Sequence, residues 1–363
     1  MTLHHRVDAA IDAALGNRIV GCVVLVGREG KLAYTRAAGM AYREAGRAMQ
    51  VDTLFRLASV TKPIVTSAAL RMVDQGLLSL DDPVSKHLPY FTPQGPDGDR
   101  PDILIRHLMT HTSGLGYNLP EDVSGGLNRP YVPLTENLRR LARQKLNFAP
   151  GTAWEYGMSI DVLGGVIAAI NASTLAEAVA RHVTGPLGMS DTGFGVADPA
   201  RLATPYADGA PPQRMTDPHD MPNGDGTFTR FSPSQIFRPN EPQSGGAGMA
   251  GSAGDVMKLL EAVLNGAFLH SDTRARALSN QIGTLPRRDS DAGKRFGLLG
   301  AVTQDPVAAG FPVPQGCVDW GGAWGHNWII EPASRTTIVT MTNTVWQGCN
   351  GPFREEIAGA VFG

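Results

Sequence analysis

Extended segments rich in β-branched residues lie at the two ends of this 363-residue chain, and most helical patterns lie between them. Near the N-terminus, residues 19–26 and 31–37 are separated by a short turn sequence, which is typical of a β-hairpin. Strand patterns return after Arg295, in residues 296–302, 317–320, 327–331 and 336–342. The sequence therefore predicts an α+β fold in which one antiparallel sheet takes strands from both termini, is flanked by helices and is interrupted by a mainly helical insertion.

The central part of the chain alternates helical patterns with long irregular stretches. Residues 59–75 repeat apolar side chains at helical spacing, and residues 252–264 do the same behind a serine that is a good N-cap. Two other stretches, 116–133 and 206–246, are rich in Pro, Gly, Asn and Asp and exceed ordinary connectors. Loops of this size are usually functional lids or flexible segments. Whether 206–246 closes over a substrate stays open at this point.

Charge and hydropathy exclude several classes of partner. The chain has 32 basic and 34 acidic residues, so no positive footprint for nucleic acid or an anionic membrane is present. Its longest apolar runs, 19–25 and 162–170, are far shorter than the roughly 20 residues of a membrane-spanning helix. Three widely spaced cysteines fit small buried side chains better than disulfides. The first residues lack a signal-peptide pattern, so we expect a cytoplasmic protein.

Motifs for metal, nucleotide and common esterase chemistry are missing. No His-Glu-x-x-His occurs, and His107 and His111 have helical spacing without a nearby acidic ligand, which favours structural histidines. Neither a phosphate-binding glycine-rich loop nor the Gly-x-Ser-x-Gly elbow of the α/β-hydrolases is present. We therefore expect no metal and no organic cofactor, and a fold other than that of the common esterases.

The sequence Ser-x-x-Lys at Ser59 and Lys62 is the chemical motif that remains. At the start of a helix, this spacing places the hydroxyl and the amine on one face, beside the positive end of the helix. A lysine held among Leu57, Ile64 and Val65 would lose some of its preference for the charged form, and a neutral amine can take the serine proton. The alternative is a serine N-cap followed by an exposed lysine.

Several ordered segments carry a family resemblance. Residues 55–62 (Phe-Arg-Leu-Ala-Ser-Val-Thr-Lys) resemble the nucleophile motif of the serine β-lactamase and penicillin-binding-protein superfamily. The resemblance spans roughly residues 8–345 and includes similar segments at 104–115, 150–159, 186–189 and 245–249. It implies a β-lactamase/transpeptidase-like fold with the active site in a cleft between two domains. The implied α/β domain comprises residues 1–66, 152–190 and 284–363, and the implied helical domain comprises 67–151 and 191–283.

Within this superfamily the sequence most resembles class C β-lactamases and the family VIII carboxylesterases, which use a tyrosine as the second catalytic group. That position is Tyr156 here. A phenol beside an ammonium has its anionic form stabilised, so the resemblance implies that Tyr156 relays a proton between Ser59 and the leaving group. Whether Lys62 or Tyr156 is the general base stays open.

The third family motif, Lys-Thr-Gly, falls at Trp-Gly-Gly, so Trp320 replaces the lysine that helps to bind a β-lactam carboxylate. In the second motif, Met158 stands where class C enzymes have an asparagine that contacts the β-lactam amide. Both changes remove polar recognition of penicillins. By motif position, the oxyanion hole consists of the amides of Ser59 and Ala323. The expected substrate contacts are Trp320, Gly321, Gly322, Trp324, His326 and Met158.

These observations predict a serine carboxylesterase that cleaves short-chain carboxylic esters through an acyl-enzyme on Ser59, with a small ester as its partner. One alternative is a β-lactam or amide hydrolase, or an acyltransferase that passes the acyl group to an alcohol. A non-enzymatic alternative is a binding module that keeps the penicillin-recognition fold without turnover. The presence of Ser59, Lys62 and Tyr156 together argues against this last alternative.

Overall fold

The computed structural model describes residues 1–363 except 129, 225, 239–242, 267 and 288–291. Within these residues the largest sheet has eight antiparallel strands in the order β10-β11-β12-β13-β14-β1-β2-β3. Their bounds are β1 (Gly21–Arg28), β2 (Lys31–Tyr42), β3 (Arg47–Ala48), β10 (Lys294–Phe296), β11 (Ala301–Thr303), β12 (Val318–Gly322), β13 (His326–Glu331) and β14 (Thr336–Thr342). The predicted sheet from both termini is confirmed.

Strand β1 joins the two ends of the chain. It pairs with β2 on one side and with β14 on the other, with Cys22 opposite Thr342 and Arg28 opposite Thr336. Seven of its eight residues are buried, so its sequence is a nearly continuous apolar run. Such a run is expected of a central strand whose two faces are both covered.

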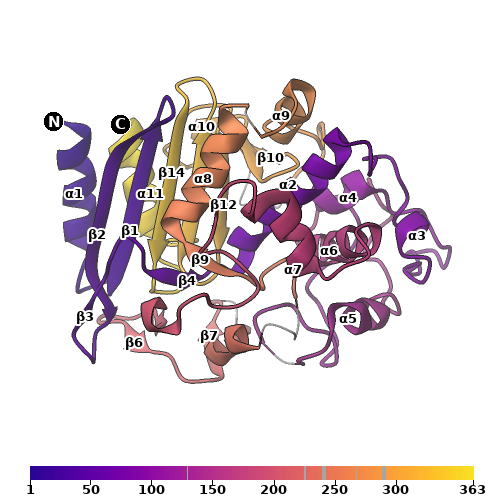
Figure 1. The fold of residues 1–363 in the computed structure, drawn as a ribbon, viewed down its shortest axis with the longest axis horizontal. Coiled ribbons are helices and arrows are strands. Elements are labelled where there is room, and N and C mark those ends of the chain that lie inside the picture. Colours follow the sequence, from indigo (N-terminus) through magenta and orange to yellow (C-terminus); the bar gives the residue numbers. More distant parts are fainter. Residues whose placement is uncertain (129, 225, 239–242, 267, 288–291) are drawn as a thin grey trace.

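Helices cover both faces of this sheet (Figure 1). Helices α1 (Leu3–Ala14) and α11 (Pro352–Phe362) pack side by side on one face, where they bury an apolar cluster that includes Val7, Ile11 and Phe353. Helix α8 (Ala253–Leu264) packs on the other face, against β1 and β14. The larger apolar core lies on the α8 side and continues into the helical region.

The helical region lies beside the sheet (Figure 1). It contains α2 (Thr61–Asp74), α3 (Val84–His87), α4 (Ile105–Met109), α5 (Leu134–Leu141), α6 (Ser159–Ile170), α7 (Leu175–Val179) and the helical turn η2 (Ala180–Thr184). Helices α9 (Ser271–Ala277) and α10 (Pro306–Ala309) come later in the sequence. Helix α2 is almost wholly buried and packs on α6. The chain therefore carries its nucleophile motif on an interior helix, where side chains are fixed by packing.

Two predicted segments differ from the structure. Residues 206–246, expected to be irregular, contain two small hairpins and a helical turn: β5 (Tyr206–Ala207), β6 (Gln213–Arg214), β7 (His219–Pro222), β8 (Phe228–Phe231) and η4 (Pro233–Phe237). The single strand expected at 296–302 is instead the hairpin β10–β11, because Gly297 and Gly300 form a turn in its middle. Short strands with polar, exposed residues lack the apolar alternation on which sequence-based prediction depends.

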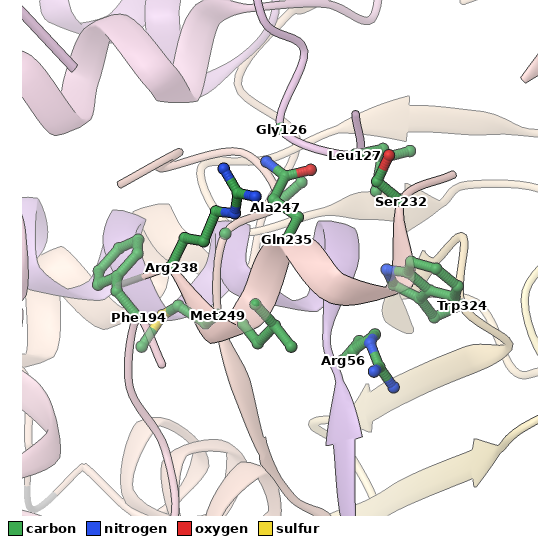
Figure 2. A pocket seen from close by; sticks show the side chains of 12 residues that line it. Arg56, Gly126, Leu127, Phe194, Ser232, Gln235, Arg238, Ala247, Met249 and Trp324 are labelled. Carbon is green, nitrogen blue, oxygen red and sulfur yellow. The ribbon is translucent and has the colours of Figure 1, made fainter. Parts of the chain in front are cut away.

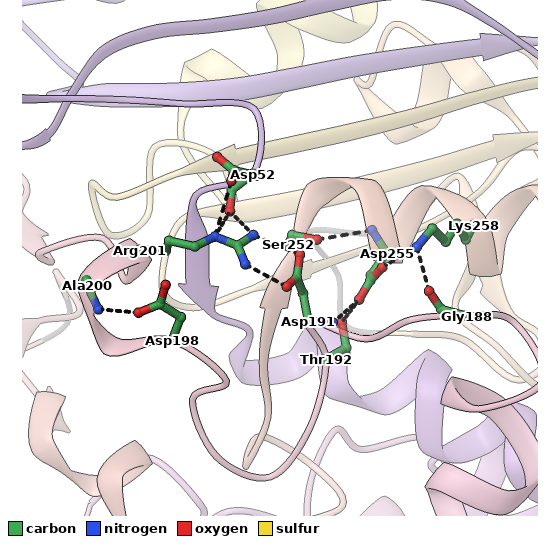
Figure 3. Close-up of polar contacts among 10 residues, drawn as sticks. All are labelled: Asp52, Gly188, Asp191, Thr192, Asp198, Ala200, Arg201, Ser252, Asp255 and Lys258. Carbon is green, nitrogen blue, oxygen red and sulfur yellow. Dashed lines mark hydrogen bonds and ion pairs between the residues drawn. The ribbon is translucent and has the colours of Figure 1, made fainter.

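A network of charged side chains fixes the strand that leads to the nucleophile (Figure 3). Asp255, at the start of α8, is 2% exposed and accepts hydrogen bonds from the Asp191 amide (2.8 Å) and the Thr192 hydroxyl (3.0 Å). Arg201 pairs with Asp191 at 2.8 Å. These contacts hold residues 191–201 against β9 (Ala250–Ser252), which pairs with β4 (Leu54–Arg56) just before Ser59.

Among the described residues, no single helix is both long and apolar enough to cross a membrane. A bent pair, Ser159–Ile170 with Leu175–Thr184, meets the criteria of length and composition together.

Candidate active site

Ser59 lies in a strained turn between β4 and α2. The preceding residue, Ala58, has φ of +44°, a left-handed conformation that is uncommon for a residue with a side chain. Backbone strain of this kind persists where the surrounding structure holds it, and it clusters at functional sites. Ser59 itself belongs to a short 3-10 turn, η1 (Ala58–Val60), that runs into α2, and it lines a large cavity. The predicted helix thus begins two residues later than expected, at Thr61.

Lys62 has three hydrogen-bond acceptors around its amine. Nζ lies 3.2 Å from Ser59 Oγ, 3.1 Å from Tyr117 Oη and 2.8 Å from the carbonyl oxygen of Gly246. The residue is 3% exposed, so water does not replace these partners. An ammonium has three N–H donors, which matches this set, whereas a neutral amine has only two.

Tyr156 completes the contacts of the nucleophile. Its hydroxyl donates to Ser59 Oγ at 2.7 Å, and it receives a hydrogen bond from the indole Nε1 of Trp320 at 3.3 Å. The Lys62 ammonium lies 4.7 Å from the centre of the Tyr156 ring. The structure therefore brings together Ser59, Lys62 and Tyr156, as the sequence predicts, and surrounds the phenol with a donor and a positive charge.

Tyr117 is a site residue that the sequence analysis missed. Besides bonding Lys62, its ring packs edge-on against Tyr156 with centroids 5.4 Å apart, and it lines the cavity. Burial and the nearby Tyr156 and Asp161 raise the pKa of Tyr117 well above 10, so its hydroxyl stays protonated. No motif marks this residue. The one available signal was its place in the long stretch 116–133, which was identified only as a functional loop or a flexible segment.

His111 packs its ring against Tyr156 and holds the backbone beside it. It is 1% exposed, its ring lies 4.8 Å from that of Tyr156, and Nδ1 accepts the amide of Gly157 at 3.4 Å. Burial, followed by the positive charges of Lys62 and Arg287, lowers the pKa of His111 well below 6.5. The ring is therefore neutral and keeps an acceptor for the backbone next to Tyr156.

No described group of three or more His, Cys, Asp and Glu side chains is arranged to hold a metal ion. The histidine pair singled out in the sequence has separate partners: His107 Nδ1 accepts the Leu104 amide at 3.2 Å, while His111 faces Tyr156.

Close packing brings β12, the strand directly before Ala323, to the turn that carries Ser59. A Cβ atom at Gly322 would overlap the carbonyl oxygen of Leu57 and lie 3.1 Å from Val60 Cγ2. Glycine therefore allows β12 to approach the turn that carries Ser59. Ala323 follows directly and lines the same cavity as Ser59, so the two predicted amide donors flank one space.

The cavity at Ser59 has a volume of about 1790 Å³ and is open to solvent. It is larger than the roughly 300–1,000 Å³ of ordinary ligand pockets. Aliphatic and aromatic side chains from the stretch 117–131 and from β8 form part of its wall, including Leu119, Val123, Leu127, Tyr131 and Phe228. Trp154, Trp320 and Gly321 line it as well.

A cation lies beside Trp320, although the family's lysine is missing there. The guanidinium of Arg287 stacks 5.3 Å from the Trp320 ring and 4.6 Å from that of Trp154, and the residue lines the cavity. The loss of the motif lysine therefore does not leave this wall without a positive charge. Lys294 also lines the cavity but is paired with Asp319 at 2.6 Å.

Four residues predicted to contact the substrate do not line this cavity. Met158 is fully buried in the core, and Gly322 packs on the turn before Ser59. His326 is 1% exposed and bonds the carbonyl of Arg56 at 2.8 Å. Burial lowers the pKa of His326 to about 4. Trp324 lines a separate small pocket beside Arg56 (Figure 2). Motif spacing could not show which of these side chains turn inward.

Comparisons with known proteins agree with this geometry. A family model described as Beta-lactamase matches residues 7–347. The chain is 46% identical to Esterase EstB of Burkholderia gladioli, over 99% of this chain and 95% of that protein. It is 26% identical to Lovastatin esterase of Penicillium rubens, over 89% and 88% of the two chains.

Among solved structures, "EstCE1, a hydrolase with promiscuous acyltransferase activity", matches with a TM-score of 0.94 at 38% identity, covering 99% of this chain and 98% of that one. A penicillin-binding protein from Bacillus halodurans has the same fold, with a TM-score of 0.70 at 20% identity over 99% of both chains. The match along nearly the whole sequence, together with a serine, a lysine and a tyrosine in mutual contact, shows that the chain belongs to the β-lactamase family.

Proposed function

We propose that this protein is a serine carboxylesterase that works through an acyl-enzyme on Ser59. The observation that carries the proposal is the contact of Ser59 Oγ with both Tyr156 (2.7 Å) and Lys62 (3.2 Å) on the wall of an open cavity. The relative with 46% identity is named an esterase, which supports the same reaction class. The family alone would also allow β-lactam hydrolysis; against it stands Trp320, which lines the cavity in place of the lysine of the third family motif.

The proposed acylation uses three groups of this chain. Ser59 Oγ bonds to the ester carbonyl carbon as its proton passes to the anionic form of Tyr156, and the carbonyl π electrons move to oxygen. The amides of Ser59 and Ala323 stabilise that oxyanion. When the tetrahedral intermediate collapses, the C–O bond to the alcohol breaks, and Tyr156 returns the proton to the departing alkoxide. Water then repeats the sequence and releases the acid.

Lys62 acts in this scheme as a charge rather than as a base. Its three acceptors match the three donors of an ammonium, and that ammonium lies against the ring of Tyr156. Trp320 adds a neutral N–H donor at the Tyr156 oxygen. A phenolate flanked by these groups is stabilised and accepts the serine proton, which favours Tyr156 as the general base.

Acyl transfer to an alcohol is a second candidate activity. The cavity of about 1790 Å³ exceeds what a short-chain ester occupies, which leaves room for an acceptor alcohol beside the acyl-enzyme. The structural neighbour EstCE1 is described as a hydrolase with promiscuous acyltransferase activity. We propose short acyl groups as the transferred part, with either water or an alcohol as the acceptor.

The test is to incubate the protein with p-nitrophenyl butyrate and to follow both nitrophenol release and the intact mass. We expect turnover and a transient mass increase of one butyryl group on Ser59, both absent in Ser59→Ala. Adding an alcohol diverts part of the product to a new ester if transfer occurs. Hydrolysis of nitrocefin at a rate similar to that of the ester, or turnover by Ser59→Ala, would contradict the proposal.

Two further proposals come from the sequence. We propose a cytoplasmic location, which cell fractionation tests. The family resemblance implies a sheet domain and a helical domain, and we propose that division. The boundaries given above need correction at two places, because α8, within 191–283, packs on β1 and β14, and α6, within 152–190, packs on α2. Limited proteolysis tests the division: cleavage should fall between the two parts and leave α8 with the sheet.

A further inference from the structure

A carboxylate that the mechanism does not use lies close to Lys62. Asp161 is in the first turn of α6 and is fully buried. Burying an ionised carboxylate is costly unless an opposite charge or hydrogen bonds compensate it. The position has no counterpart among the motifs identified in the sequence.

One backbone segment separates the two charges. The Ser244 hydroxyl donates to Asp161 Oδ1 at 2.5 Å, and the carbonyl oxygen of Gly246 accepts from Lys62 Nζ at 2.8 Å. A Cβ atom at Gly246 would overlap Asp161 Oδ2 and would lie 3.3 Å from Lys62 Nζ. The carboxylate and the ammonium therefore face the same backbone position from two sides, with only a glycine between them.

The other titratable groups around Lys62 are uncharged or anionic only during catalysis. Tyr117 stays protonated because burial raises its pKa, and His111 stays neutral because burial lowers its pKa. Burial raises the pKa of Asp161, while Lys62, the Ser244 hydrogen bond and the Gly246 backbone oppose that rise. Among these described groups, Asp161 is the carboxylate that faces Lys62 across Gly246.

We propose that Asp161 is a positioning residue that keeps Lys62 in its ammonium form and so leaves Tyr156 to take the serine proton. This inference rests on the proposed function. Without the carboxylate, an ammonium that is 3% exposed would lose the negative charge that faces it across Gly246. A neutral amine would then have two N–H donors for three acceptors, and the set that aligns Ser59, Tyr117 and Gly246 would be broken.

The first experiment is the pH dependence of kcat/KM for Asp161→Asn. The amide has nearly the same shape and can still accept from Ser244, but it carries no charge. We expect the alkaline limb of the profile to move at least about one pH unit lower, in line with the effect of removing a close opposite charge. Asp255→Asn is the matched control, because Asp255 is also a buried carboxylate in the first turn of a helix and lies on α8, away from the cavity.

A uniform fall in activity with both limbs unmoved would overturn the proposal, since a purely structural role predicts that result. An equal shift of the alkaline limb in Asp255→Asn would overturn it as well.

The second experiment measures melting temperature in a double-mutant cycle and needs no activity. Asp161→Asn is expected to lower the melting temperature of the native protein by several degrees. In the Lys62→Met background the same change should raise it, because it removes a buried charge that has lost its partner. Equal destabilisation in both backgrounds would show that the two charges are not coupled and would overturn the proposal.

If Asp161→Asn alone does not fold, the proposal requires that the double variant fold; failure of both overturns it. The cycle also separates the two levels of inference. Loss of coupling with normal acylation of Ser59 removes the role of Asp161 and leaves the esterase intact. Strong coupling without acylation removes the esterase and leaves the charge pair.

Discussion

The hydrogen bond from Trp320 to Tyr156 gives the sharpest test of the proposed mechanism. Trp320→Phe removes the indole Nε1–H that lies 3.3 Å from the Tyr156 oxygen and keeps an aromatic ring between Tyr156 and Phe296. A hydrogen bond to a charged group contributes about 1.5–3 kcal/mol. Because 3.3 Å is long for this bond, we take the lower figure of about 1.5 kcal/mol, which corresponds to roughly a tenfold loss of kcat/KM.

The assay is steady-state hydrolysis of p-nitrophenyl butyrate, with burst kinetics to separate acylation from release of the acid. The loss should appear in acylation, since the donor stabilises the form of Tyr156 that accepts the serine proton. Trp328→Phe is the control: Trp328 pairs with Trp320 across the strands, is fully buried and has an indole nitrogen without a hydrogen-bond partner among the described residues. If both variants lose acylation equally, the donor has no specific role and the reasoning fails.

Three other predictions concern the same region. Tyr117→Phe removes one acceptor of the Lys62 ammonium at 3.1 Å, a bond with a charged donor that contributes about 1.5 kcal/mol, so kcat/KM should fall about tenfold with little change in melting temperature; an unchanged rate would contradict its role. Gly322→Ala places a methyl group against Leu57, so acylation should fall more than a hundredfold in a folded protein, as intact mass after a timed incubation would show. The folded chain keeps His326 neutral down to about pH 4, whereas an unfolded histidine titrates near 6.5, so the unfolded state binds more protons between these values and stability is lost as pH falls through that window. His326 should account for about 3 kcal/mol of this loss in denaturant unfolding, and the loss should be smaller by about that amount in His326→Gln, with the remainder due to other buried histidines such as His111.

The sequence predicted the catalytic contacts better than their surroundings. Ser59 and Lys62 are three residues apart, so local helix geometry already brings them together. Tyr156 is 97 residues away from Ser59 and was placed by resemblance alone. The sheet was predictable because β1 and β14 are long and rich in β-branched residues, which favour strands.

The residues that the sequence analysis missed reach the site through tertiary packing. Tyr117 and Arg287 come from irregular segments without periodicity, and Asp161 lies in the first turn of a helix where an acidic residue is ordinary. The reverse error occurred at Met158 and His326, which lie within the right motifs but point into the core. Motif position fixes where the backbone lies, whereas the direction of each side chain depends on what packs against it.

The pairing of β1 with β14 has a consequence for biosynthesis. The two strands are separated by about 300 residues, so at 5–20 residues per second the ribosome needs on the order of 15–60 s to deliver the second strand after the first. During that interval the apolar edge of β1 has no native partner, and an unpaired edge of this kind invites association with other chains. Yield in a host cell should therefore depend on chaperone capacity more than on the stability of the finished protein.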